Sequence, residues 1–145
     1  MDLVIGIGNR LRRDDGIGPA LVESFGERAG AEFRVVHQLT PDLAPRVGEA
    51  DRVLFVDAAI DEAETCLRPV EGDASRGIGH TLAPAGLLHL VTTLYGVTPP
   101  AWVLAVPGSD FEIGETLSRD ASERLPEARR RIEAWLEAGT VPTRT

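Results

Sequence analysis

The chain has 145 residues, of which 43% are hydrophobic and 26% charged, and this composition predicts one soluble domain with a substantial core. Its formal net charge of −8 argues against nucleic acid as a partner. The 15 basic residues are all arginine, which excludes a Schiff-base lysine and a phosphate-loop lysine.

The single cysteine and the length of the apolar segments indicate the cellular compartment of the protein. Cys66 permits no internal disulfide, which is typical of a protein from a reducing cytoplasm. No secretory signal is recognisable after Met1, and no segment approaches the roughly 18 apolar residues that a membrane span needs. We therefore expect a cytoplasmic protein without a membrane partner.

The N-terminal segment predicts a strand, a loop and a helix. Leu3–Ile7 is a continuous apolar run that breaks into glycines, as expected of a strand covered on both faces. A charged loop with the adjacent acids Asp14 and Asp15 follows. Apolar residues then recur at helical spacing over 17–25, and we expect Asp15 to be the N-cap of this helix.

The rest of the chain alternates between apolar runs of strand length and segments of helical periodicity. Further strands are expected at 33–36, 53–56, 65–70 and 101–106, and further helices at 41–48, 83–95 and 121–135. In the last helix, Pro126 predicts a kink or a broken first turn. Residues 1–139 should form a single domain, and 140–145 a frayed tail.

This alternation predicts a three-layer α/β sandwich with a mostly parallel sheet and right-handed crossovers. Ligands of such sheets bind at the carboxyl ends of the strands, where the strand order reverses. With helices crossing to opposite faces, that point falls between the first and third strands. Asp15 follows the first strand and Asp57 ends the third, so the fold should bring these two acids together.

Two familiar chemistries fit the sequence poorly. A dinucleotide fingerprint starting at Gly6 and Gly8 would need a third glycine where Leu11 stands, and two carboxylates would face the pyrophosphate. A serine hydrolase would need a G-x-S-x-G elbow, which is absent. Ser109 follows a predicted strand but lacks the surrounding glycine pattern.

A metal site is the sharper hypothesis. Asp15, Asp57 and His80 together would offer two carboxylates and one imidazole, a set that suits a borderline divalent ion such as Ni²⁺ or Zn²⁺. The spacing matches no compact zinc motif, and each residue alone could be a cap or a turn residue. We expect His37 to be a satisfied or solvated side chain away from this site, and His89 to pack in its helix.

Several short motifs occur in order along nearly the whole chain. They are G-I-G-N, D-D-G-I-G, V-L-F-V-D-A-A, G-H-T-L, V-P-G-S, G-E-T-L-S and L-P-E-A. Together they resemble the nickel-iron hydrogenase maturation endopeptidases. Members of that family are cytoplasmic proteases with a five-stranded α/β sandwich in which one strand is antiparallel, so the resemblance implies this fold here.

The resemblance also implies an activity. Family members remove a C-terminal extension from the hydrogenase large-subunit precursor after nickel insertion. Carried over by motif, Asp15, Asp57 and His80 would bind the nickel that the substrate carries, and zinc or another divalent ion could replace it in vitro. Asp15 and Asp57 would be the catalytic acids, and either is a candidate general base.

Contacts to the substrate are expected from Asn9, Asp14 and Thr40. Many family members have a G-G-T loop after the second strand, whereas this chain has H-Q-L-T-P-D-L, in which only Thr40 stays in register. That loop should border the cleft. Two alternatives stay open: a non-catalytic checkpoint that binds the nickel-loaded large subunit, and a general metallohydrolase with its own zinc.

Overall fold

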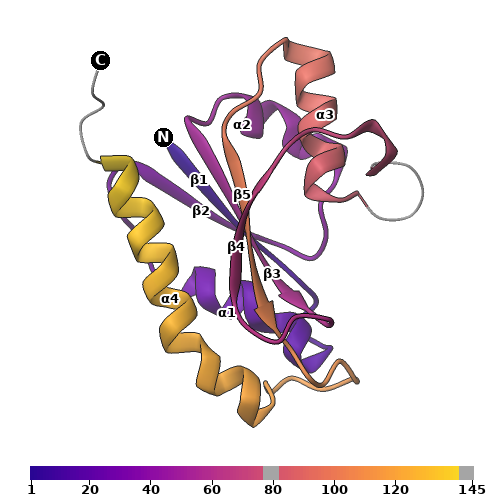
Figure 1. The fold of residues 1–145 in the computed structure, drawn as a ribbon, viewed down its shortest axis with the longest axis vertical. Helices are drawn as coiled ribbons and strands as arrows, with labels where there is room; N and C mark the ends of the chain where they lie inside the picture. The colour runs from indigo at the N-terminus through magenta and orange to yellow at the C-terminus, as the bar shows by residue number, and fades with distance from the viewer. Residues whose placement is uncertain (77–81, 141–145) are drawn as a thin grey trace.

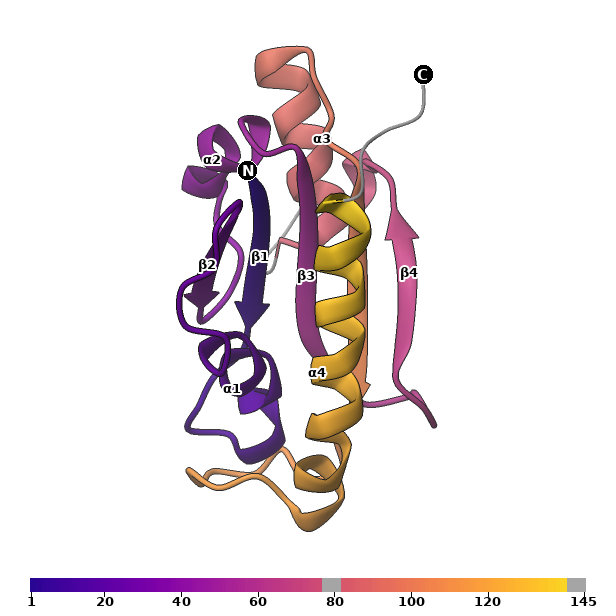
Figure 2. The ribbon, with the colours of Figure 1, turned by 90° about the vertical axis from the view of Figure 1, so that its left-hand side faces the viewer.

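Five strands form one sheet in the computed structural model, which describes residues 1–76 and 82–140 (Figure 1). The strands are β1 (Asp2–Ile7), β2 (Ala31–Val36), β3 (Arg52–Ala59), β4 (Cys66–Val70) and β5 (Ala101–Pro107). Their spatial order is β2-β1-β3-β5-β4, and all neighbours are parallel except β4 and β5. Figure 2 shows β2 and β4 at opposite edges of the sheet. The predicted fold, with its one antiparallel strand, is confirmed.

Helices cover both faces of this sheet. They are α1 (Ile17–Glu23), α2 (Ala44–Gly48), α3 (Pro84–Tyr95) and α4 (Arg119–Thr140), with short 3-10 helices η1 (Arg13–Gly16), η2 (Pro41–Leu43) and η3 (Ala74–Arg76). Helices α1 and α4 pack on one face, and α2 and α3 on the other. Within the described residues, no helix has both the length and the apolarity that crossing a membrane requires.

The central strands owe their continuous apolar runs to this double cover. Leu3 and Ile5 of β1 belong to the core beneath α2 and α3, whereas Val4 between them belongs to the core beneath α1 and α4. The same alternation holds for Leu54 and Phe55 of β3. Because successive side chains of a strand point to opposite faces, every position of a doubly covered strand is apolar.

The strand order reverses between β1 and β3, as predicted. Helix α1 connects β1 to β2 across one face, and α2 connects β2 to β3 across the other. The chain thus passes from β1 to the strand on one side of it and then to the strand on its other side. Strands β1 and β3 are paired in parallel up to Gly6 and Val56. Their carboxyl ends, and the residues that follow them, therefore lie side by side.

The start of α1 differs from the prediction. The N-cap of α1 is Gly16, and no side chain caps it; Asp15 lies one residue earlier, inside the η1 turn. The predicted capping role of Asp15 is therefore wrong. The helix also ends at Glu23, before Phe25, whose ring instead stacks on Phe33 of β2 with 5.3 Å between ring centroids.

The last helix is longer than predicted. It begins at Arg119 and continues without interruption through Pro126, so the predicted break in its first turn is wrong. Thr140 is its last residue, and the rest of the predicted tail, 141–145, lies outside the described residues.

Candidate metal-binding cleft

A cleft of about 610 Å³ opens at the carboxyl ends of β1 and β3. It lies where the strand order reverses, which is where parallel α/β sheets bind their ligands. Polar side chains from several loops line it, with Leu39 and Leu82 among the apolar ones. The polar residues are Asn9, Arg12, Asp15, His37, Gln38 and Asp57.

The two acids predicted to converge do meet in this cleft. Both Asp15 and Asp57 line it, and the negative charge of Asp15 acts on Asp57. The pKa of Asp57 is raised from 3.8 to about 7, chiefly by burial and secondly by the negative charge of Asp15, and the N–H of Ala58 opposes this shift. That N–H donates to Asp57 Oδ1 at 2.9 Å. Whenever both carboxylates are ionised, this half-buried pair therefore carries a mutual repulsion.

Glycines hold Asp15 against the sheet. Gly8 has a φ of +155°, and a Cβ at this position would lie 1.8 Å from the backbone oxygen of Asp15. A Cβ at Gly18 would lie 2.5 Å from the backbone oxygen of Val56, at the end of β3. Only glycine permits these two approaches. The glycines of the N-terminal motif thus serve close packing of loop and helix on the strand ends.

Among the described residues, the carboxylate of Asp15 has one hydrogen-bond partner. Its Oδ2 accepts a hydrogen bond from the backbone N–H of Asn9 at 2.6 Å. Asn9 turns its own side chain into the loop, where Oδ1 accepts from the N–H of Leu11 at 2.9 Å. Asn9 therefore lines the cleft and also positions Asp15, and its contact with a substrate stays a prediction.

Asp14 lies elsewhere, despite being the neighbour of Asp15. Its side chain is fully buried and is not among those that line the cleft. Oδ2 of Asp14 accepts hydrogen bonds from the backbone N–H groups of Ser109 and Asp110, at 2.8 and 3.0 Å. Ser118 donates twice: its hydroxyl to Oδ2 and its backbone N–H to Oδ1 of Asp14, both at 2.7 Å. Burial raises the pKa of Asp14, but these hydrogen bonds outweigh it and lower the pKa below its ordinary value.

This geometry gives Asp14 a structural role. One carboxylate fastens both ends of the loop between β5 and α4 to the loop after β1. All of these donors come from residues about a hundred positions later in the chain, so local sequence gives no sign of the contact. We predicted a substrate contact for Asp14, and its position offers none.

The loop after β2 borders the cleft, as predicted, but through different residues. Thr40 precedes η2 in an extended conformation and does not line the cleft. His37 does line it, although we expected this histidine away from the site. Leu39 explains the course of the loop, because it is buried in the core beneath α3 and draws the chain over the end of β1. His89, expected to pack, is exposed on α3.

The third predicted ligand, His80, lies outside the described residues. Among the residues that the structure does describe, no group of three or more His, Cys, Asp or Glu side chains is close enough to hold a metal ion. The described part of the site is therefore the carboxylate pair Asp15 and Asp57, with His37 and Arg12 on the walls of the cleft.

These features define a class of protein: an α/β sandwich with a mixed five-stranded sheet and a carboxylate pair in the cleft at its switch point. No family model and no curated protein sequence matches the chain. Solved structures do match it over nearly its whole length. The chain has the fold of the [NiFe] hydrogenase maturation proteases.

Three of these structures illustrate the likeness. The hydrogenase maturating endopeptidase HybD from E. coli matches with a TM-score of 0.73 and 17% identity, covering 96% of this chain and 93% of that one. The maturation protease HycI from Thermococcus kodakarensis KOD1 matches with a TM-score of 0.72 and 16% identity, covering 94% and 92%. An endopeptidase from Escherichia coli reaches 0.73 at 20% identity, covering 97% and 94%.

Proposed function

We propose that this protein is an endopeptidase that removes the C-terminal extension of the nickel-loaded [NiFe] hydrogenase large-subunit precursor. One observation carries the proposal. Two acids from distant parts of the chain, Asp15 and Asp57, share the switch-point cleft of a fold found in structures named hydrogenase maturation proteases. The sequence motifs that surround both acids resemble the same family, independently of the fold.

The donor set fits a divalent cation. Burial and, secondly, the repulsion from Asp15 raise the pKa of Asp57, and a cation bound between the two carboxylates would relieve that repulsion. Carboxylate oxygens together with an imidazole suit nickel or zinc. We assign nickel binding to Asp15, Asp57 and His80, and we treat the nickel as part of the substrate, which the protease recognises before it cleaves.

The remaining chemistry is hydrolysis of one peptide bond. A bound cation would polarise the scissile carbonyl or a water molecule near it. Either carboxylate can accept the proton of the attacking water, and the pKa of about 7 at Asp57 suits proton exchange near neutral pH. Asn9 holds Asp15 in place through its backbone N–H throughout.

Mass spectrometry of the precursor tests the proposal. The purified protein, incubated with nickel-loaded precursor, should release one C-terminal peptide, and nickel-free precursor should stay intact. We expect Asp15→Asn, Asp57→Asn and His80→Ala each to slow release by about 100-fold or more, since each removes a ligand or the base. Full activity in both Asp15→Asn and His80→Ala would refute the assignment.

Matched controls separate this effect from a general loss of acid or histidine. Asp51→Asn removes an exposed carboxylate at the opposite end of β3, and His89→Ala removes an exposed imidazole on α3. Both should cleave at the wild-type rate. Tight binding of the precursor without peptide release would instead favour a non-catalytic checkpoint, and stoichiometric zinc in the purified protein would favour a metallohydrolase with its own metal.

A further inference from the structure

Two large apolar side chains are exposed beside the cleft. Leu11 is 60% exposed and Ile113 is 88% exposed, although they belong to loops about a hundred residues apart. The backbones of the two loops are hydrogen-bonded to each other. The N–H of Gly114 donates to the carbonyl oxygen of Leu11 at 2.8 Å, and the N–H of Arg13 donates to the carbonyl oxygen of Gly114 at 2.9 Å. Arg12 and Gly114 form a parallel bridge, so Leu11 and Ile113 are neighbours in register.

These exposed side chains stand on an anchored platform. Buried Asp14 fastens the loop that carries Ile113 through four hydrogen bonds from its backbone and a serine hydroxyl. Arg12 Nε donates to the carbonyl of Phe111 at 3.1 Å, and Arg13 Nε donates to that of Thr116 at 3.1 Å. A surface that is already ordered loses little conformational entropy when a partner binds it.

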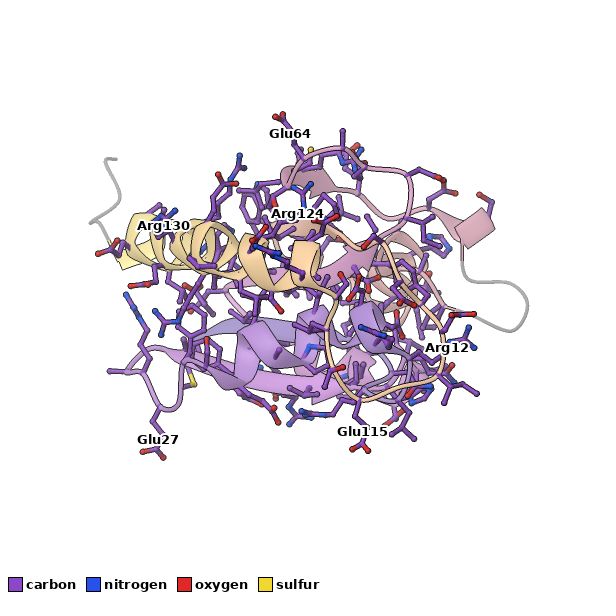
Figure 3. All side chains as sticks on the ribbon, turned by 90° about the horizontal axis from the view of Figure 1, so that it is seen from below. Arg12, Glu27, Glu64, Glu115, Arg124 and Arg130 are labelled. Carbon is purple, nitrogen blue, oxygen red and sulfur yellow. The ribbon has the colours of Figure 1, made fainter. Side chains whose placement is uncertain are left out.

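Arg12 connects this platform to the cleft. It lines the cleft that holds Asp15, yet it lies in sequence next to Leu11. Figure 3, seen from the end where the parallel strands finish, shows Arg12 beside the loop that also carries Glu115. Within the described residues Arg12 forms no ion pair, so its exposed guanidinium is free to meet a carboxylate of a partner.

We propose that Leu11, Arg12 and Ile113 form a docking rim for the folded large-subunit precursor, which would face the rim with an apolar patch and a carboxylate. This inference rests on the proposed function. Three features favour such a partner: Arg12 continues the rim into the cleft, its positive charge has no ion pair among the described residues, and the rim is rigid before binding. A second copy of this chain fits less well, because each copy carries a net charge of −8.

Charge insertion on the rim tests the proposal. Leu11→Glu and Ile113→Glu should each raise the KM for nickel-loaded precursor by about tenfold or more, with kcat within about twofold of wild type, because a docking contact contributes to binding alone. The matched control is Leu94→Glu, whose side chain is 57% exposed. It belongs to α3, a helix at the opposite end of the molecule from the loop between β5 and α4 (Figure 1). This control should leave KM unchanged. An unchanged KM in both rim variants would overturn the proposal.

Two further measurements keep the docking rim and the protease activity separable. If wild-type protein releases no peptide, the proposed function fails. Calorimetric titration with the precursor then shows whether the docking rim binds it. If Ile113→Glu binds the precursor about tenfold more weakly than wild type, the docking rim is supported even in the absence of cleavage. If wild-type protein does not bind the precursor, the docking rim is overturned. Sedimentation that shows a wild-type dimer and an Ile113→Glu monomer would also overturn it, in favour of self-association.

Discussion

Asp14 and Asp15 are adjacent in the chain but differ in nearly every physical respect. The carboxylate of Asp14 is fully buried and accepts hydrogen bonds at both oxygens, so its pKa falls below the ordinary value. The carboxylate of Asp15 lies in a cleft, accepts one backbone hydrogen bond and faces a second acid, Asp57. One acid is fully satisfied by the fold, and the other keeps hydrogen-bonding capacity that the proposed function assigns to a ligand.

The comparison teaches how a single turn serves two purposes. In η1, successive residues point in different directions, so one acid turns into the protein and the next turns toward the strand ends. Asp14 stabilises the folded chain, because hydrogen bonds to a charged group are stronger than those to a neutral one. The pair Asp15 and Asp57 has the opposite effect, since like charges in a partly buried site destabilise the folded chain. A site that binds a cation has this unfavourable character before the cation arrives.

The largest expected change in stability follows from removing the carboxylate of Asp14. Asp14→Ala should lower the free energy of unfolding by about 3–5 kcal/mol, because it leaves three partly buried backbone N–H groups and a hydroxyl without their acceptor. Chemical denaturation at pH 7 measures the change. The neighbour provides the control: Asp15→Ala removes the partner of one N–H and should cost less than about 1 kcal/mol. Equal losses in the two variants would contradict the comparison.

A change of intermediate size in the free energy of unfolding is expected at Asp57, where the substitution should stabilise the protein instead of destabilising it. The folded-state pKa of Asp57, about 7, lies above the ordinary value of 3.8, so between these pH values the folded protein binds more protons than the unfolded chain. The contribution of Asp57 to stability should therefore fall as pH rises from about 4 to about 7. Asp57→Asn removes this dependence and should be more stable than wild type by about 1–3 kcal/mol at pH 8, after discounting for partial exposure.

Thermal or chemical unfolding in the presence of a chelator, from pH 4 to pH 8, measures this difference. At pH 4 the wild type and Asp57→Asn should be similar, because Asp57 is protonated there. Asp61→Asn, which removes an exposed acid after the same strand, is the control and should follow the wild-type curve. A variant that is less stable than wild type at pH 8 would show that Asp57 carries favourable contacts as an anion.

The arrangement of strands and the meeting of Asp15 with Asp57 could be predicted because they depend on patterns along the chain. Apolar runs of strand length alternate with helical periodicity, and this alternation leaves few topologies for the sheet. Once the switch point is placed between β1 and β3, the residues that end these strands must lie together.

The loops could not be predicted in the same way, because their conformations depend on distant partners. The η1 turn is held by donors at Ser109 and Ser118, which no local pattern indicates. His37 enters the cleft because Leu39 is buried under α3, and a single apolar residue of this kind gives no periodic signal in the sequence. The nickel assignment and the role of His80 remain predictions that the proposed cleavage assay tests.

The smallest and most specific effect concerns the coupling between the two cleft acids. Burial is the larger cause of the raised pKa of Asp57, and the charge of Asp15 is the smaller one. Asp15→Asn should therefore lower the pKa of Asp57 from about 7 only part of the way toward 3.8, as followed by carbon NMR of the Asp57 carboxyl in metal-free protein. Asp14→Asn serves as the matched variant and should leave this pKa in place wherever the protein stays folded. A pKa of Asp57 that returns fully to 3.8 in Asp15→Asn would mean that repulsion, and not burial, controls the site. The cleft would then be an open acidic surface, in contrast to the buried environment of Asp14.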